Sequence, residues 1–164
     1  KINCFMDAEK IKLGVYQHLP ELLKYVKAGA IEKEMDEYNG WLSVRLNHAF
    51  NGRKGVRKFY AHEVDKLNQT IWQLADKLMN TNIEYSEDRT LCAQNVKQAF
   101  APLMMIQVAT DKLGWKVNYI AKRITLGSSS RKRQSFSAAD VQQITLCIRQ
   151  LGMYMHSIEY YLDQ

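Results

Sequence analysis

The sequence predicts an all-α protein, and three observations lead to this prediction. Apolar residues recur at the i, i+3, i+4 spacing of one helix face in long runs, within residues 19–26, 64–78 and 141–151. The chain of 164 residues contains only 2 Pro and 8 Gly, so few positions interrupt a helix. Stretches in which apolar and polar residues alternate, typical of half-buried strands, are scarce. We therefore expect helices joined by polar connections.

The expected helices follow one another in a regular order along the chain. Pro20 and Pro102 can each begin a helix, because proline is favoured at a first helical position, and an apolar run follows both. Shorter apolar patterns follow at residues 40–47 and 118–125, and long ones at 59–78 and 136–155. The C-terminal stretch MYMHSIEYYL continues the last pattern and is expected to form the docking face of a last helix.

A capping box marks the start of the last long helix. Ser137 is the expected N-cap, and Asp140 stands three residues later, where a carboxylate can accept a bond from the N-cap amide. Phe136 and Val141 flank this pair at the positions of a hydrophobic staple. The earlier long helix keeps the staple and the acid, as Phe59, Glu63 and Val64, but Tyr60 is a poor cap.

The two halves of the chain resemble each other, which predicts a diverged tandem repeat. Shifting residues 59–78 by 77 positions onto 136–155 aligns six identical residues, namely Phe59, Ala61, Val64, Ile71, Gln73 and Leu74 with their counterparts. Upstream, one residue out of register, residues 40–47 align with 118–125, and Arg45 meets Arg123. We expect one helical unit at 1–80 and a second at 86–164. The alternative is chance similarity, since amphipathic helices mimic one another.

Positive charge is concentrated in two segments that contain no acid. The net charge is +6, yet residues 41–58 alone carry +5 and residues 113–133 carry +6. A solvated helix face normally interleaves both signs, so segments of this kind favour an anionic partner such as nucleic acid. The alternative is that the charge only keeps the protein in solution.

Residues 109–124, ATDKLGWKVNYIAKRI, resemble a helix-turn-helix of the Cro and phage-repressor type. Leu113, Gly114 and Trp115 match the turn of that family, and Ile120 and Ile124 match the buried positions of its second helix. Gly114 stands where a left-handed backbone is needed between the helices. The resemblance implies a groove-facing set of side chains on the second helix, made up of Lys116, Val117, Asn118, Tyr119, Ala121 and Lys122.

The first repeat departs from this family pattern. Asp36 replaces the turn glycine, Glu37 replaces an apolar residue, and Glu32 falls where a small residue normally packs between the helices. The corresponding recognition face at residues 38–44 is uncharged. We therefore expect the first unit to keep the fold and to lose base recognition.

The sequence points to no catalytic activity, cofactor or metal site. It contains no phosphate-cradling Gly-rich loop, no HExxH and no CxxC, and no Ser or Cys lies in a nucleophile-elbow context. The three cysteines are far apart and are expected to be reduced. No apolar run is long enough to span a membrane and no secretory leader is visible, so we expect a cytoplasmic protein without a membrane partner.

Two functions of different class follow from these features. The first is a regulator of transcription or of a mobile element that binds double-stranded DNA with full or partial sequence specificity. The second is a helical interaction scaffold whose basic face binds an acidic protein or RNA. In either case the aromatic C-terminal helix is a candidate homodimer contact, and no small-molecule ligand is expected. The expected DNA-binding residues are Lys116, Asn118, Tyr119, Lys122, Arg123, Arg131, Lys132, Arg133, Arg45, Arg53, Lys54, Arg57 and Lys58.

Overall fold

A computed structural model describes residues 9–47, 57–125 and 134–163 of the chain. The fold is all-α apart from one short parallel pair of strands, as the hydrophobic periodicity predicts. In chain order, the described elements are β1 (Ile11–Gly14), α1 (Val15–Leu22), α2 (Ala28–Glu34), α3 (Trp41–Leu46), α5 (Ala61–Met79), α6 (Arg89–Ala99), α7 (Met105–Asp111), α8 (Tyr119–Thr125), α9 (Ala138–Ser157) and β2 (Ile158–Tyr161).

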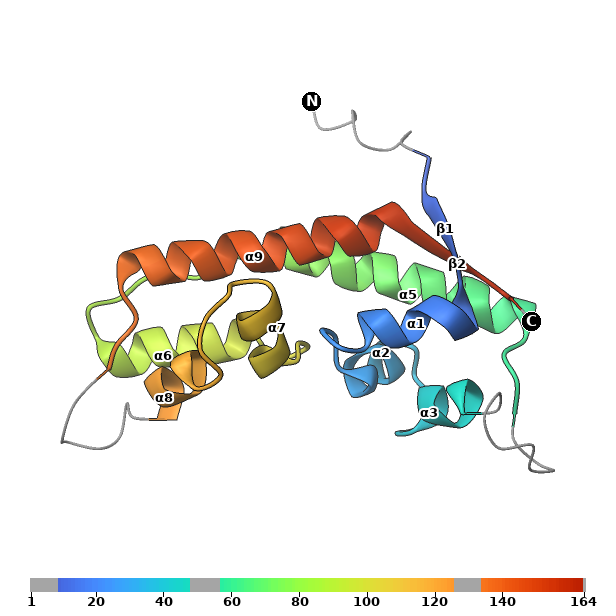
Figure 1. The fold of residues 1–164 in the computed structure, drawn as a ribbon, viewed down its shortest axis with the longest axis horizontal. Helices are drawn as coiled ribbons and strands as arrows, with labels where there is room; N and C mark the ends of the chain where they lie inside the picture. Colours follow the sequence, from blue (N-terminus) through green and yellow to red (C-terminus); the bar gives the residue numbers. More distant parts are fainter. Residues whose placement is uncertain (1–8, 48–56, 126–133, 164) are drawn as a thin grey trace.

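The helices form two layers (Figure 1). The two longest, α5 and α9, run antiparallel along the length of the molecule and make one layer. The shorter helices make the other layer, with α1, α2 and α3 at one end and α6, α7 and α8 at the other. The helices α3 and α8 therefore lie near opposite ends of the same long side of the molecule, away from α5 and α9.

A close helix crossing holds the long layer together. Gly152 of α9 lies against α5, where a Cβ at this position would come within 2.8 Å of the Ala75 carbonyl oxygen and of the Met79 amide nitrogen. Only a residue without a side chain permits this approach of the two backbones. Around the crossing, apolar residues of both helices are almost fully buried, including Leu67 and Ile71 on α5 and Ile144 and Ile148 on α9.

Several contacts join residues that stand 77 positions apart in the chain. Val26 and Leu103 form an antiparallel bridge at this separation, and Ala75 and Gly152 meet at the same separation. Two side-chain hydrogen bonds are also related by this offset. The donor of one, Trp72, lies 77 positions before the donor of the other, Arg149. The two acceptors, Thr81 and Ile158, are separated by the same number. The Trp72 Nε1 donates to the Ile158 carbonyl and the Arg149 Nε donates to the Thr81 carbonyl, each at 2.8 Å. The offset equals that of the sequence alignment.

The prediction that the C-terminal stretch continues the last helix is wrong for its final residues. The helix α9 ends at Ser157, and β2 pairs in parallel with β1, with Ile11 opposite Ile158. Along β2, Ile158 and Tyr160 are buried while their neighbours are more exposed, which is the two-residue period of a strand. A second strand from the opposite end of the chain offers this backbone its hydrogen-bond partners, which no local pattern reveals.

The start of α1 also depends on the C-terminal end of the described chain. The Asp163 carboxylate accepts bonds from the amides of Tyr16, at 2.8 Å, and Gln17, at 3.2 Å. These amides belong to the first turn of α1 and have no partner within the helix. The expectation that Pro20 begins this helix is wrong, since Pro20 lies inside α1.

Side-chain caps mark the starts of α9 and α6. The Ser137 side chain accepts from the Asp140 amide and the Asp140 side chain accepts from the Ser137 amide, which confirms the capping box. At α6, Asp88 accepts from the amides of Thr90 and Leu91.

Cys92 and Cys147 are buried free thiols. Within the part of the chain described, no helix combines the length and the apolar character needed to cross a membrane.

Candidate nucleic-acid interface

The turn after α7 has the backbone that the resemblance predicts at its glycine. Gly114 adopts a left-handed conformation with φ of +67°, which confirms the expectation for this position. On either side of it the chain folds back on the end of α7. The Leu113 amide donates to the Val108 carbonyl at 3.3 Å, and the Trp115 amide donates to the Ala109 carbonyl at 3.0 Å. The glycine thus ends α7 and reverses the chain.

The second helix of the resemblance, which is expected to carry side chains from Lys116 onward, begins later than that. It begins at Tyr119, so residues 112–118 all belong to the connection between α7 and α8. A helix-turn-helix joins its helices through about 3–4 residues, so this connection is longer than the pattern requires. The Tyr119 amide donates to the Lys116 carbonyl at 2.9 Å. Lys116, Val117 and Asn118 therefore lie on a turn that leads into α8.

Burial divides these residues largely as predicted. Ile120 is buried in the core and Ile124 packs against the core while partly buried. Lys116, Asn118 and Lys122 are exposed. The polar side of the turn and of α8 is therefore open to solvent, while the apolar side holds α8 on the body of the protein.

An open depression of about 750 Å³ lies between this turn and α8. Its charged lining residues are Lys116, Lys122 and Arg123, and none of the described residues that line it is acidic. Asn118 adds an amide that can both donate and accept hydrogen bonds. Gln134 adds a second amide, so the depression offers a positively charged surface with two groups able to bind a base edge. Its complete lining is Gly114, Trp115, Lys116, Val117, Asn118, Tyr119, Lys122, Arg123 and Gln134.

Tyr119 anchors α8 instead of presenting its hydroxyl to a partner. The hydroxyl donates to the Asp140 carboxylate, 3.1 Å from each oxygen, and the ring lies 4.5 Å from the ring of Trp115 between centroids. Burial raises the pKa of Tyr119, and the hydrogen bond to Asp140 raises it further. The phenol thus stays protonated as a donor at neutral pH. Tyr119 can therefore contact DNA only through the exposed part of its ring.

Arg123 lies partly buried across the Tyr119 ring. Its guanidinium carbon is 3.4 Å from the ring centroid, and its Nη1 donates to the Tyr119 carbonyl at 3.0 Å. Its Nε is buried and has no hydrogen-bond partner among the residues that the structure describes. Burying a donor without a hydrogen-bond partner costs free energy, and most buried polar atoms in proteins are paired. The Arg123 Nε is therefore an unusual group in this site.

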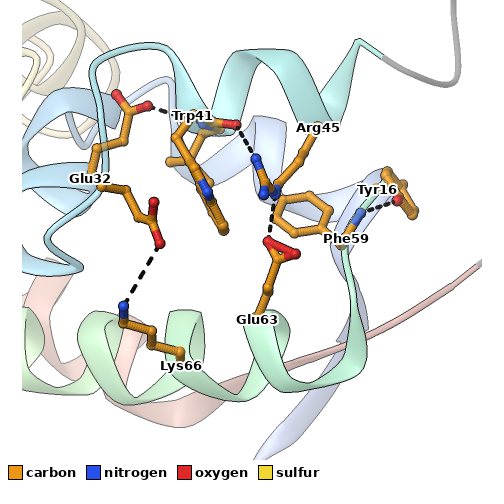
Figure 2. A network of polar contacts seen from close by, with 9 residues as sticks. Tyr16, Glu32, Trp41, Arg45, Phe59, Glu63 and Lys66 are labelled. Carbon is orange, nitrogen blue, oxygen red and sulfur yellow. Dashed lines mark hydrogen bonds and ion pairs between the residues drawn. The ribbon is translucent and has the colours of Figure 1, made fainter. Parts of the chain in front are cut away.

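Arg45, which the sequence places among the DNA-binding residues, points into the protein in this structure. Arg45 is 4% exposed, and its Nε donates to the Glu63 carboxylate at 2.5 Å (Figure 2). Its guanidinium carbon lies 3.8 Å from the centroid of the Trp41 ring. An arginine can stand in a basic segment and still point inward when a carboxylate is buried opposite it. Glu63 lies 18 residues further along the chain, so the segment itself gives no signal of this pair.

The first unit keeps the turn geometry although its residues depart from the family pattern. Asp36 stands in the place of Gly114 and has a φ of +58°, a conformation that Asp tolerates better than most residues. Glu32 is 3% exposed, and its carboxylate accepts from the Leu42 amide at 3.0 Å, in the first turn of α3 (Figure 2). Lys66 and Glu37 form an ion pair at 3.8 Å. These acids fix α3 to the body of the protein.

The remaining expected DNA-binding residues belong to the two connections that precede α5 and α9. Arg57 and Lys58 are exposed just before α5. Arg53, Lys54, Arg131, Lys132 and Arg133 lie outside the described residues. The structure therefore brings Lys116, Asn118, Lys122 and Arg123 together at one site and separates Arg45 from them.

Comparisons with protein-family models, with curated proteins and with solved structures find no match to this chain.

Proposed function

We propose that this protein binds double-stranded DNA and acts as a regulator of transcription or of a mobile element. The observation that carries the proposal is the depression beside α8, which gathers three cations and two amides, Asn118 and Gln134, with no acid among its described lining residues. Phosphate contacts from Lys and Arg supply most of the affinity of such surfaces for DNA. The proposal includes a cytoplasmic location, where this ligand would be available.

In this proposal the exposed side chains have separate roles. Lys116 and Lys122 contact backbone phosphates and set the position of the protein on the duplex. Asn118, on the turn between them, is the candidate for base recognition, because an Asn amide can form two hydrogen bonds with adenine in the major groove. The two-turn helix α8 serves mainly to hold this turn on the protein surface.

We further infer that the chain is a tandem repeat whose two units are related by an approximate two-fold axis. In a two-fold arrangement, equivalent residues meet one another on the axis and contacts away from it occur in pairs. Val26 with Leu103 and Ala75 with Gly152 fit the first condition. The bonds from Trp72 and Arg149 fit the second. Such an axis places α3 and α8 as equivalents on one long side, as two half-site contacts of a dimeric repressor would lie (Figure 1).

One observation favours the alternative function, an interaction scaffold. A groove of about 700 Å³ runs beside α6 and α7, with apolar atoms of Phe100, Leu103, Met104 and Ile106 in its lining. Met104 and Ile106 are 43% and 52% exposed. Large exposed apolar side chains of this kind suit a protein partner better than DNA. A scaffold of this type would bind through the groove and use its basic residues at the rim.

A titration of fluorescently labelled duplex DNA, followed by anisotropy at two salt concentrations, tests the proposed function. We expect the logarithm of the binding constant to fall with the logarithm of the salt concentration by about 0.9 for each phosphate contact. Charge neutralisation at Lys122 by Lys122→Gln should reduce that slope by about the same amount for all duplexes. Absence of salt-dependent binding at low ionic strength would reject DNA binding, and tighter binding to single-stranded RNA than to duplex would favour the alternative.

A further inference from the structure

The two units hold one arginine each in closely similar surroundings. Arg45 of α3 and Arg123 of α8 both lie over the aromatic ring four residues earlier, Trp41 and Tyr119, at 3.8 Å and 3.4 Å. Both also direct Nη1 at the backbone carbonyl of that aromatic residue, at 3.4 Å and 3.0 Å. The stacking on the ring and one hydrogen bond are thus shared, and the Nε atoms differ.

The difference lies in the acid that faces each arginine. In the first unit, Glu63 in the first turn of α5 binds the Arg45 Nε. In the second unit, Asp140 occupies the same position in α9, three residues after the N-cap, and has a side chain shorter by one methylene. Its carboxylate is engaged by the Tyr119 hydroxyl and by the Ser137 amide, at 3.1 Å and 3.0 Å. The Arg123 Nε, which is the atom that Glu63 satisfies in Arg45, is left without a partner.

The surroundings of Arg123 indicate what would satisfy this donor. Arg123 lines the depression together with Lys116 and Lys122, so the local charge is positive. An oxyanion would gain from all three cations and would complete the hydrogen bonds of the guanidinium. The geometry of a guanidinium edge, with Nε and Nη2 parallel, matches two oxygens of one phosphate.

We infer that Arg123 is the phosphate anchor of this site: its Nε edge, buried in the free protein, turns into the depression and grips a backbone phosphodiester when DNA binds. The inference deepens the proposed function, since it depends on DNA being the ligand of the depression. In the first unit the Glu63 carboxylate binds the corresponding edge of Arg45. It thus takes the position that the phosphate takes in the second unit. DNA binding is consequently asymmetric, with its strong phosphate contact at the α8 end.

Asp140→Glu tests this inference because it converts the second unit to the arrangement of the first. The longer side chain can reach Arg123 as Glu63 reaches Arg45, and Glu is the usual residue at this position of a capping box, so folding is preserved. We expect duplex binding about tenfold weaker, the size of one charge-assisted hydrogen bond, and a salt slope smaller by about 0.9. Arg123→Lys keeps the net charge and removes the forked edge, and should weaken binding several-fold.

The matched control is Lys12→Gln on β1. Lys12 is exposed, with its side chain 71% accessible, and it belongs to the strand pair outside the α8 end of the molecule (Figure 1). This variant loses one positive charge, as Arg123→Gln does, and should change binding less than twofold. If Lys12→Gln and Arg123→Gln lose the same affinity, only net charge matters and the inference is wrong. Suppose that the wild-type protein binds duplex DNA and that Asp140→Glu and Arg123→Lys both bind it as tightly as the wild type. The inference about Arg123 is then wrong, while the proposed function stands.

The NMR signal of the Arg123 Nε–H group tests this contact directly. The signal is assigned as the one that disappears in Arg123→Lys. We expect this signal to shift when duplex DNA is added and to stay in place when inorganic phosphate is added at the same phosphate concentration. A shift with inorganic phosphate alone would point to a site for a small phosphate compound and would overturn the backbone contact. An unchanged signal in the DNA complex would overturn the inference directly. Absence of any DNA complex would instead reject the proposed function.

Discussion

The helices α3 and α8 illustrate how similar local structures can expose or conceal the same group. Both follow a left-handed residue, Asp36 or Gly114, and both present an arginine stacked on an aromatic ring. In α3 the arginine binds Glu63 and is buried. In α8 the equivalent acid, Asp140, binds the Tyr119 hydroxyl, and the arginine Nε has no partner among the described residues. One methylene in the acid and one hydroxyl on the ring account for this difference. The comparison teaches that the charge of a segment does not show which of its cations reach solvent.

The largest expected effect is a loss of folding stability, and it should be greater for Glu63 than for Asp140. Glu63→Ala leaves Arg45 buried and charged without its partner, so we expect a loss of about 3–5 kcal/mol in the free energy of unfolding. Asp140→Ala removes one half of the capping box and the acceptor for Tyr119, and should cost about 1 kcal/mol. Urea denaturation of the two variants measures both. Equal losses would show that the two arginine sites do not differ as described.

The next largest effect concerns the crossing of α5 and α9, the contact that joins the two units. Gly152→Ala places a methyl group 2.8 Å from the Ala75 carbonyl oxygen and should cost about 1–3 kcal/mol through overpacking. Gly29→Ala in α2 is the control, because nothing lies within 4 Å of a Cβ there. That substitution should be neutral or stabilise by up to about 1 kcal/mol. Thermal unfolding compares them, and a neutral Gly152→Ala would contradict the close crossing.

The third prediction compares base recognition by the two turns. Asn118→Ala should weaken binding to a preferred duplex by about 1–3 kcal/mol and leave binding to random duplex nearly unchanged. Asn39→Ala, at the corresponding turn of the first unit, should have a much smaller effect, because its neighbours there include no exposed cation like Lys116. Anisotropy with a selected duplex and a scrambled one distinguishes them. Comparable losses from both variants would mean that the two units recognise bases alike.

The smallest expected effect is a pH dependence that only the second unit can show. Burial, with the bond to Asp140, raises the pKa of Tyr119 above its ordinary value of 10.0. The unfolded chain then ionises this phenol first, so its contribution is fully present below about pH 10 and is lost as the pH rises through the raised pKa. Trp41, at the same place in the first unit, does not titrate. Tyr119→Phe should therefore reduce the slope of unfolding free energy against pH above about pH 10. Urea denaturation at several pH values measures this slope, and an unchanged slope would contradict the prediction.

Much of the helical framework was predictable from sequence because its signals are local. The 3.6-residue periodicity that predicts the long helices is produced by side chains that share one face, such as Leu67, Ile71 and Leu74. The Ser137 capping box and the left-handed Gly114 depend on residues within a few positions of each other. The burial of Ile120 follows from the same short-range pattern. Wherever a preference is decided within one helical turn, the residues alone were enough.

The tertiary structure alone decided which groups at the candidate site are free. The pairing of Arg45 with Glu63, the capping of α1 by Asp163 and the pairing of β1 with β2 all join groups that are distant in the chain. Their energies come from desolvation and hydrogen bonding, which depend on what lies within a few ångströms in space. The sequence by itself therefore determined that positive charge gathers beside α3 and α8. Only tertiary contacts decided that Arg45 is paired with Glu63 of α5 and that the Arg123 Nε has no partner among the described residues.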